Sequence, residues 1–163
     1  MFSSVVSPSL DSTDKKTLYA EIHRALRAVL TGESDPIANL ANAAALLFCS
    51  LPAVNWTGFY LFKERELVLG PFQGKIACVR IKLGQGVCGS AAEQRQTLVV
   101  PNVHEFPGHI ACDSASNSEI VVPIIKNDAL IGVLDIDSPE FTRFDDNDKA
   151  GLQEFVQILT AAL

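Results

Sequence analysis

The sequence lacks the features that would place the protein in a membrane or on nucleic acid. No apolar run reaches the roughly 18–20 residues that a membrane-spanning helix needs. Basic residues are outnumbered, and the net charge of −6 disfavours nucleic acid or an anionic membrane surface as the main partner. The N-terminus has neither a positively charged region nor a long apolar segment, so we expect no secretory signal and a reducing, cytoplasmic location.

Linkers, internal repeats and low-complexity segments are also missing. A chain of 163 residues without a linker is expected to form one domain that spans residues 1–163. Its hydrophobic content of 48% is sufficient for a packed core. The serine-rich residues 1–10 are expected to be a loose tail.

Helical periodicity is present at both ends of the chain. The first predicted helix follows the capping residues 11–14 and ends near Thr31. A second helix opens at Asp35 and Pro36 and ends at Pro52, because aspartate caps a helix and proline suits its first turn but not its interior. A last helix begins near residues 145–146.

The middle of the chain changes to the alternating pattern of β-strands. The predicted strands are residues 55–63, 67–69, 78–83, 97–100, 118–125 and 130–136. A glycine-rich turn at residues 84–89 is expected to lead into a short helix at residues 90–95. Strands next to strands, with helices at both chain ends, predict an α+β fold with an antiparallel sheet covered by helices.

Three of the four cysteines lie in segments that are expected to be loops or element ends. Cys78 and Cys88 flank the third predicted strand, and Cys112 lies in a long loop at residues 101–117. In a reducing compartment this placement indicates thiol chemistry rather than structural disulfides. The fourth, Cys49, sits in an apolar helical run and is predicted to belong to the core.

Acidic residues interrupt two strands that are otherwise apolar. Asp135 and Asp137 are two residues apart, so both side chains point to one face of their strand, and Glu119 lies in the preceding strand. Carboxylates are costly to bury without partners, and like charges on one face indicate a bound cation or a shared proton. Trp56 and Tyr60 share one face of the first strand.

Six segments together resemble the free methionine-(R)-sulfoxide reductases, which are small GAF-domain enzymes. These segments are residues 55–60, 69–75, 86–89, 107–113, 118–123 and 134–138. The resemblance runs from about Asn55 to Phe144, with flanking helices that are consistent with it. It implies a single GAF domain that reduces the free amino acid methionine-(R)-sulfoxide, and not methionine sulfoxide within proteins.

For the cysteines, the resemblance implies a division of roles. Cys112 is the expected nucleophile, Cys78 the usual resolving thiol and Cys88 a second thiol that can take part. A thiolate that attacks a sulfoxide becomes a sulfenic acid, which condenses with a nearby thiol to a disulfide. Thioredoxin would then regenerate the dithiol by exchange. A homodimer through the N-terminal helices is also implied, and no cofactor is expected.

The resemblance also marks the acidic and aromatic residues as functional. We expect Glu119 and Asp137 to hold the substrate ammonium and the polarised sulfoxide oxygen, with one of them protonated and Asp135 in support. Trp56 and Tyr60 would form a wall for the S-methyl group, whose sulfur carries partial positive charge.

Backbone N–H groups of Gly86, Val87 and Cys88 are expected to bind the substrate carboxylate, since they lie where the glycine-rich turn enters a helix. No Gly-Lys-Ser/Thr follows this turn, so it does not match a phosphate-binding loop.

Two other functions remain compatible with the sequence. One is a GAF sensor or binding module for a cyclic nucleotide or tetrapyrrole, which would not need the cysteine set. The other is a thiol redox switch or peroxidase that uses the same cysteines. A zinc site built from Cys78, Cys88, Cys112 and a histidine is disfavoured because no Cys-x-x-Cys pair is present, and no metal is expected.

Overall fold

The computed structural model describes residues 14–108 and 114–163, and the fold below refers to these residues. The predicted tail at residues 1–10 and the predicted nucleophile Cys112 lie outside them. Within the described residues, no helix combines the length and the apolar character needed to cross a bilayer.

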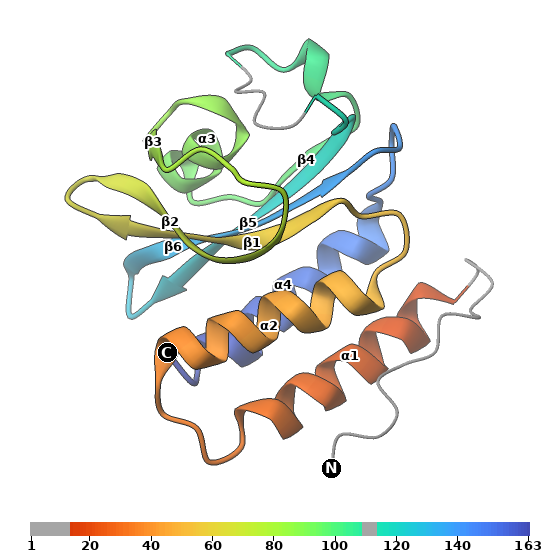
Figure 1. The fold of residues 1–163 in the computed structure, drawn as a ribbon, viewed down its shortest axis with the longest axis vertical. Helices are drawn as coiled ribbons and strands as arrows, with labels where there is room; N and C mark the ends of the chain where they lie inside the picture. Colours follow the sequence, from red (N-terminus) through yellow and green to blue (C-terminus); the bar gives the residue numbers. More distant parts are fainter. Residues whose placement is uncertain (1–13, 109–113) are drawn as a thin grey trace.

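The chain forms two helices, then a series of strands interrupted by short helices, and a final helix (Figure 1). The elements are α1 (Lys15–Leu30), α2 (Pro36–Ser50), β1 (Trp56–Lys63), β2 (Glu66–Gly74), β3 (Arg80–Lys82), α3 (Gly86–Gln94), β4 (Leu98–Val100), the 3-10 helix η1 (Val103–Glu105), β5 (Ser118–Lys126), β6 (Ala129–Ser138) and α4 (Asp146–Thr160). The strands form one six-stranded sheet in the order β3-β2-β1-β6-β5-β4. All neighbouring pairs are antiparallel, which confirms the predicted α+β class.

The helices start where their capping residues predict. Asp14 accepts a hydrogen bond from the Thr17 backbone N–H and caps α1, and Asp35 caps α2 directly before Pro36. Asp145 caps α4 within a capping box, in which each of two aspartates accepts from the other's backbone. These local interactions satisfy N–H groups that have no partner inside the helix, so the start sites are specified by short sequence signals.

The sheet has two different faces because alternate side chains point to opposite sides. Helices α2 and α4 pack against one face, and α1 packs on α2 and α4 (Figure 1). A core of aliphatic and aromatic side chains fills this layer, including Phe59, Ile120, Leu134 and Phe155. The opposite face is covered by α3 and by the β2–β3 connection, over a second cluster that contains Trp56, Tyr60, Val121 and Val133.

Two local predictions near α3 were wrong in their boundaries. Helix α3 begins at Gly86 rather than near residue 90, so most of the predicted glycine-rich turn is its first turn. Gly86 has a φ of 59°, which glycine adopts without strain. A Cβ on Gly89 would lie 2.3 Å from the Lys82 carbonyl oxygen, so this glycine lets the helix pack closely against the preceding strand. Strand β3 is shorter than predicted, and Cys78 precedes it.

The prediction that Cys49 belongs to the core was wrong, because its side chain is exposed. Helix α2 is apolar on nearly every side, so its sequence does not show which face is buried. The buried face contains Ala43, Ala44 and Leu47. A residue two positions after Leu47 lies about 200° around the helix, and this places Cys49 on the outer face.

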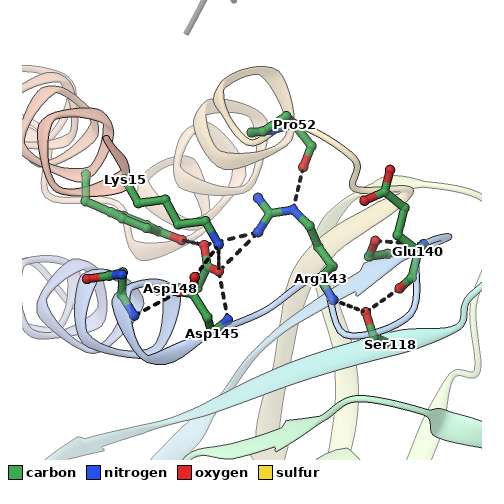
Figure 2. A network of polar contacts seen from close by, with 10 residues as sticks. Lys15, Pro52, Ser118, Glu140, Arg143, Asp145 and Asp148 are labelled. Atoms are coloured by element: carbon green, nitrogen blue, oxygen red, sulfur yellow. Dashed lines mark hydrogen bonds and ion pairs between the residues drawn. The ribbon is translucent and has the colours of Figure 1, made fainter. Parts of the chain in front are cut away.

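A buried carboxylate joins α1 to the start of α4 (Figure 2). Asp148 is 1% exposed and accepts hydrogen bonds from Lys15 Nζ, Arg143 Nη1 and the Tyr19 hydroxyl. Arg143 also donates from Nε to the Pro52 carbonyl oxygen at 3.0 Å, which ties the end of α2 to the same network. The two cations and the hydroxyl compensate the cost of removing the Asp148 charge from water.

Replacing Asp148 with alanine is expected to destabilise the fold by about 3–5 kcal/mol, because Lys15 and Arg143 would lose their buried partner. Urea unfolding monitored by circular dichroism measures this change. Asp146→Ala is the matched control in the same helical turn, since Asp146 is exposed and its loss should cost less than about 1 kcal/mol. Equal midpoints for the two variants would show that the network contributes nothing.

Candidate functional site

A cavity lies between α3 and the sheet, on the face opposite α2 and α4. It brings together the site residues that the sequence predicted within the described part of the chain, except for Cys78, which is not in its lining. Those in the cavity lining are Trp56, Tyr60, Gly86, Val87, Cys88, Glu119, Asp135 and Asp137. They come from β1, α3, β5 and β6, so the site depends on the folded sheet rather than on one loop.

The register of β5 and β6 places Glu119, Asp135 and Asp137 close together on one face of the sheet. Glu119 on β5 is directly opposite Asp137 on β6, and Asp135 is two residues along β6 on the same face. Trp56 on β1 is opposite Asp137 on its other side. Glu119 is 6% exposed and Asp135 7% exposed, so both carboxyls are removed from bulk water.

Burial and mutual repulsion leave a proton on this cluster. The pKa of Glu119 is raised well above its usual value, first by burial and then by the charges of Asp135 and Asp137. Burial raises the pKa of Asp135 to about 6, and hydrogen bonds from Cys88 and Glu119 oppose part of that rise. The hydrogen bond between Glu119 and Asp135 raises the pKa of Glu119 and lowers that of Asp135, so Glu119 is the member of this coupled pair that favours the protonated form.

Cys88 lies in the first turn of α3, and its side chain is buried against the acids. Its Sγ is 3.9 Å from Glu119 Oε1. Burial, followed by the nearby charges of Asp135 and Glu119, raises the pKa of Cys88 well above that of a free thiol. Cys88 is therefore a thiol at neutral pH, and a thiol is a poor nucleophile compared with a thiolate.

The aromatic pair also anchors the segment that carries Cys78. The Trp56 indole Nε1 donates to the Lys75 carbonyl oxygen, and the Tyr60 hydroxyl donates to the Cys78 carbonyl oxygen, each at 3.0 Å. These bonds hold the β2–β3 connection at the edge of the cavity. Cys78 itself is disulfide-bonded, and Cys112, its predicted partner, lies outside the described residues.

Sequence reasoning missed two residues that shape the aromatic wall. The Trp56 ring stacks on Tyr60 and on Phe72, with centroid distances of 5.9 Å and 5.3 Å. A Cβ on Gly58 would lie 2.3 Å from Phe72 Cβ and 2.6 Å from Trp56 Cη2, so the stack requires glycine beneath it. The alternation of Trp56, Gly58 and Tyr60 on one strand face was the signal that could have identified this role.

The N-terminus of α3 faces the same cavity. Gly86, Val87 and Cys88 are its first three residues, and their N–H groups have no acceptor within the helix. The N-cap residue Gln85 makes no side-chain capping bond. These N–H groups and the helix dipole favour an anion such as a carboxylate.

Three further lining residues carry polar atoms and were not predicted: Lys75, Gln85 and Ser116. The Ser116 hydroxyl accepts from Asn55 Nδ2 at 3.1 Å, which links the entry of β1 to the segment before β5. Lys75 and Gln85 are ordinary surface residue types, so no sequence pattern distinguished them.

Comparisons with known proteins agree with the family resemblance that the sequence shows. The model of the GAF domain family matches residues 21–163. Over 150 residues the chain is 52% identical to the free methionine-R-sulfoxide reductase of Escherichia coli (strain K12), covering 92% of this chain and 91% of that protein. The structure of fRMsr of Staphylococcus aureus in complex with substrate is 48% identical, with a TM-score of 0.86 over 98% of this chain and 99% of that one. The free methionine-R-sulfoxide reductase of Neisseria meningitidis in complex with its substrate is 44% identical, with a TM-score of 0.89 over 97% and 95%.

Proposed function

This chain belongs to the free methionine-R-sulfoxide reductases of the GAF-domain family, and we propose from this that it reduces free L-methionine-(R)-sulfoxide to L-methionine as a single GAF domain. One observation carries the proposal: a cavity in which buried acids, stacked aromatic rings and a helix N-terminus meet beside a disulfide-bonded cysteine. Each part of that lining corresponds to a chemical group of the substrate.

The recognition of the amino acid follows from the charges in the cavity. In this proposal Asp135 and Asp137, which line the cavity from one face of β6, bind the substrate ammonium, so Asp135 takes a direct role where the sequence predicted a supporting one. The free N–H groups at the start of α3 bind the substrate carboxylate. Trp56 and Tyr60 contact the S-methyl group with their ring faces.

Glu119 supplies the proton for the chemical step. It is the neutral acid of the cluster, so it can donate to the sulfoxide oxygen as the S–O bond breaks. The Cys112 sulfur attacks the sulfoxide sulfur, and the protonated oxygen then transfers to Cys112 as its bond to the substrate sulfur and the transient bond between the two sulfurs break. Methionine leaves, and Cys112 becomes a sulfenic acid. Attack by the Cys78 thiol then forms a disulfide and releases water, so both electrons come from the two cysteines.

The raised pKa of Cys88 supports Cys78 as the resolving thiol. A buried thiol beside two acids forms little thiolate, whereas Cys78 lies at the edge of the cavity and is already disulfide-bonded in this structure. Cys88 then serves as a backup thiol. Thioredoxin is the proposed reductant, and exchange with it returns both cysteines to thiols.

The proposed assembly is a homodimer through the N-terminal helices, in the reducing cytoplasm. The exposed side chains of Ile37 and Cys49 on α2 leave apolar surface on this layer that is available for such contacts.

Replacing Cys78 with serine is expected to limit the enzyme to about one methionine per chain, after which Cys112 remains oxidised. Rapid quench followed by methionine quantification measures the burst. Cys49→Ser is the matched control, because Cys49 is exposed on α2 and should leave multiple turnover intact. Undiminished multiple turnover of Cys78→Ser would exclude an essential role for Cys78, and a Cys78→Ser/Cys88→Ser double variant would then show whether Cys88 replaces it.

The ammonium contact provides a direct test of the proposed substrate class. N-acetyl-methionine sulfoxide lacks the charge that Asp135 and Asp137 would bind, so its kcat/KM should be lower by at least about tenfold to a hundredfold. Steady-state rates with dithiothreitol as reductant compare the two substrates. Equal rates would mean that the acids do not recognise the amino group.

A further inference from the structure

The thiol and two carboxyls in the cavity also form a set of metal ligands. Ligand atoms of Cys88, Glu119 and Asp135 all lie within 4.8 Å of one another, and all three residues are buried. They come from α3, β5 and β6, so the sheet and its covering helix converge on this point. A thiolate with carboxylate oxygens is a donor set for a borderline-soft divalent cation such as Zn²⁺.

A second observation indicates that a ligand is needed here. Asp135 Oδ1 has no hydrogen-bond partner among the described residues, although Asp135 is only 7% exposed and lines the cavity. Most buried polar atoms in folded proteins are paired, so an unpaired buried carboxylate oxygen indicates an absent partner. The substrate ammonium and a metal ion are both cations that could bind to it.

We propose that Cys88, Glu119 and Asp135 form a binding site for Zn²⁺ or a cation of the same class, and that the bound ion inhibits the enzyme by excluding the substrate ammonium. The site is distinct from a zinc-cysteine site that would use Cys78 and Cys112, because it needs neither of them. Cation binding rests on the ligand geometry and on the unpaired Asp135 Oδ1, and it does not require the proposed function. The inhibition rests on the proposed function, since it requires that the substrate ammonium occupies the same position.

Binding of the ion releases protons from its ligands. The ion replaces the Cys88 thiol proton and the proton held between Glu119 and Asp135, and a water molecule completes four ligands. No redox partner is needed, and a chelator reverses the step. Because the ion joins α3 to the sheet, its binding should also raise the thermal unfolding midpoint.

Cadmium is a suitable probe, because Cd²⁺ bound to thiolate gives an ultraviolet charge-transfer band. The experiment uses the oxidised protein, in which Cys78 is disulfide-bonded and does not compete for the ion. The wild type should show a saturable band, Cys88→Ser should lose it, and Cys49→Ser should keep it. A band that disappears in Cys49→Ser but persists in Cys88→Ser would overturn the site, since the exposed thiol would then be the ligand.

A carboxylate variant keeps the proposal testable if Cys88→Ser fails to fold. Asp135→Asn retains the thiol and the shape of the side chain, and it should weaken Cd²⁺ binding by at least about tenfold, because it removes a charged ligand. Unchanged affinity in a folded Asp135→Asn protein would contradict the proposed ligand set.

Competition between Cd²⁺ and free methionine sulfoxide tests the proposed inhibition. It uses the same oxidised protein and needs no turnover. Free methionine sulfoxide added to the Cd²⁺-loaded oxidised wild type should bleach the charge-transfer band. A band that survives saturating sulfoxide would refute exclusion while leaving the cation site in place. An enzyme that binds Cd²⁺ at Cys88 but reduces no sulfoxide would contradict the proposed function and leave the metal site standing.

Discussion

Replacing Cys112 with serine is expected to lower the turnover of free methionine-(R)-sulfoxide by on the order of a thousandfold or more, with the fold preserved. A hydroxyl cannot accept oxygen from a sulfoxide in the way that a thiolate does, and no sulfenic acid can form. Methionine production measured with dithiothreitol as reductant gives the rate, and circular dichroism verifies the fold.

Cys49→Ser is again the control, because it removes a thiol from the outer face of α2 without touching the cavity. Near-normal activity in Cys112→Ser would mean that another cysteine attacks the sulfoxide. Cys88 is poorly suited to that role, since burial and the adjacent acids keep it as a thiol.

Replacing Glu119 with glutamine is expected to lower kcat by about 10²–10⁴-fold, because the amide has the same shape but cannot transfer the proton to the departing oxygen. Pre-steady-state measurement of methionine formation isolates this chemical step. Glu93→Gln is a matched control on the exposed side of α3 and should keep the wild-type rate.

The dependence of the rate on pH identifies the group. In the wild type, kcat should fall as pH rises through the raised pKa of Glu119, since the proton donor is lost there. In Glu119→Gln that limb should disappear. At the acidic end, KM should rise as pH falls below about 6 in both proteins, because protonation of Asp135 removes a charge that binds the ammonium. A decline at high pH that persists unchanged in Glu119→Gln would assign it to another group.

Much of the fold was predictable because its signals are local. Asp14, Asp35 and Asp145 each cap a helix at the residue where the sequence changes from polar to periodic. The alternation from Trp56 to Tyr60 and the spacing of Asp135 and Asp137 fixed which side chains share a sheet face. Because successive side chains of a strand point to opposite faces of the sheet, placing one residue on a face also places its neighbours.

Properties that depend on tertiary packing were less accessible. Helix α2 is apolar on nearly every side, so only its contacts with the sheet and α1 decide that Cys49 faces outward. The start of α3 at Gly86 depends on a left-handed glycine and on close packing of Gly89 against Lys82. Such close approaches follow from the path of the whole chain and have no local pattern.

The sequence alone also did not show which acid in the cavity carries the proton. The sequence indicated that one of the acids is protonated, but the pairing of β5 with β6 determines which one. Glu119 is buried between its neighbours and feels the charges of both Asp135 and Asp137. The assignment of Glu119 as the proton donor therefore depends on strand register, which a single sequence does not display.

Stereochemistry gives the most direct test of the whole account. Thioredoxin-coupled NADPH consumption should be measured with free L-methionine-(R)-sulfoxide and the S epimer as parallel substrates, with all cysteines reduced at the start. Turnover of the R epimer alone is the predicted result, because the chain belongs to the free methionine-R-sulfoxide reductases. Equal turnover of both epimers, or turnover of neither, would contradict it.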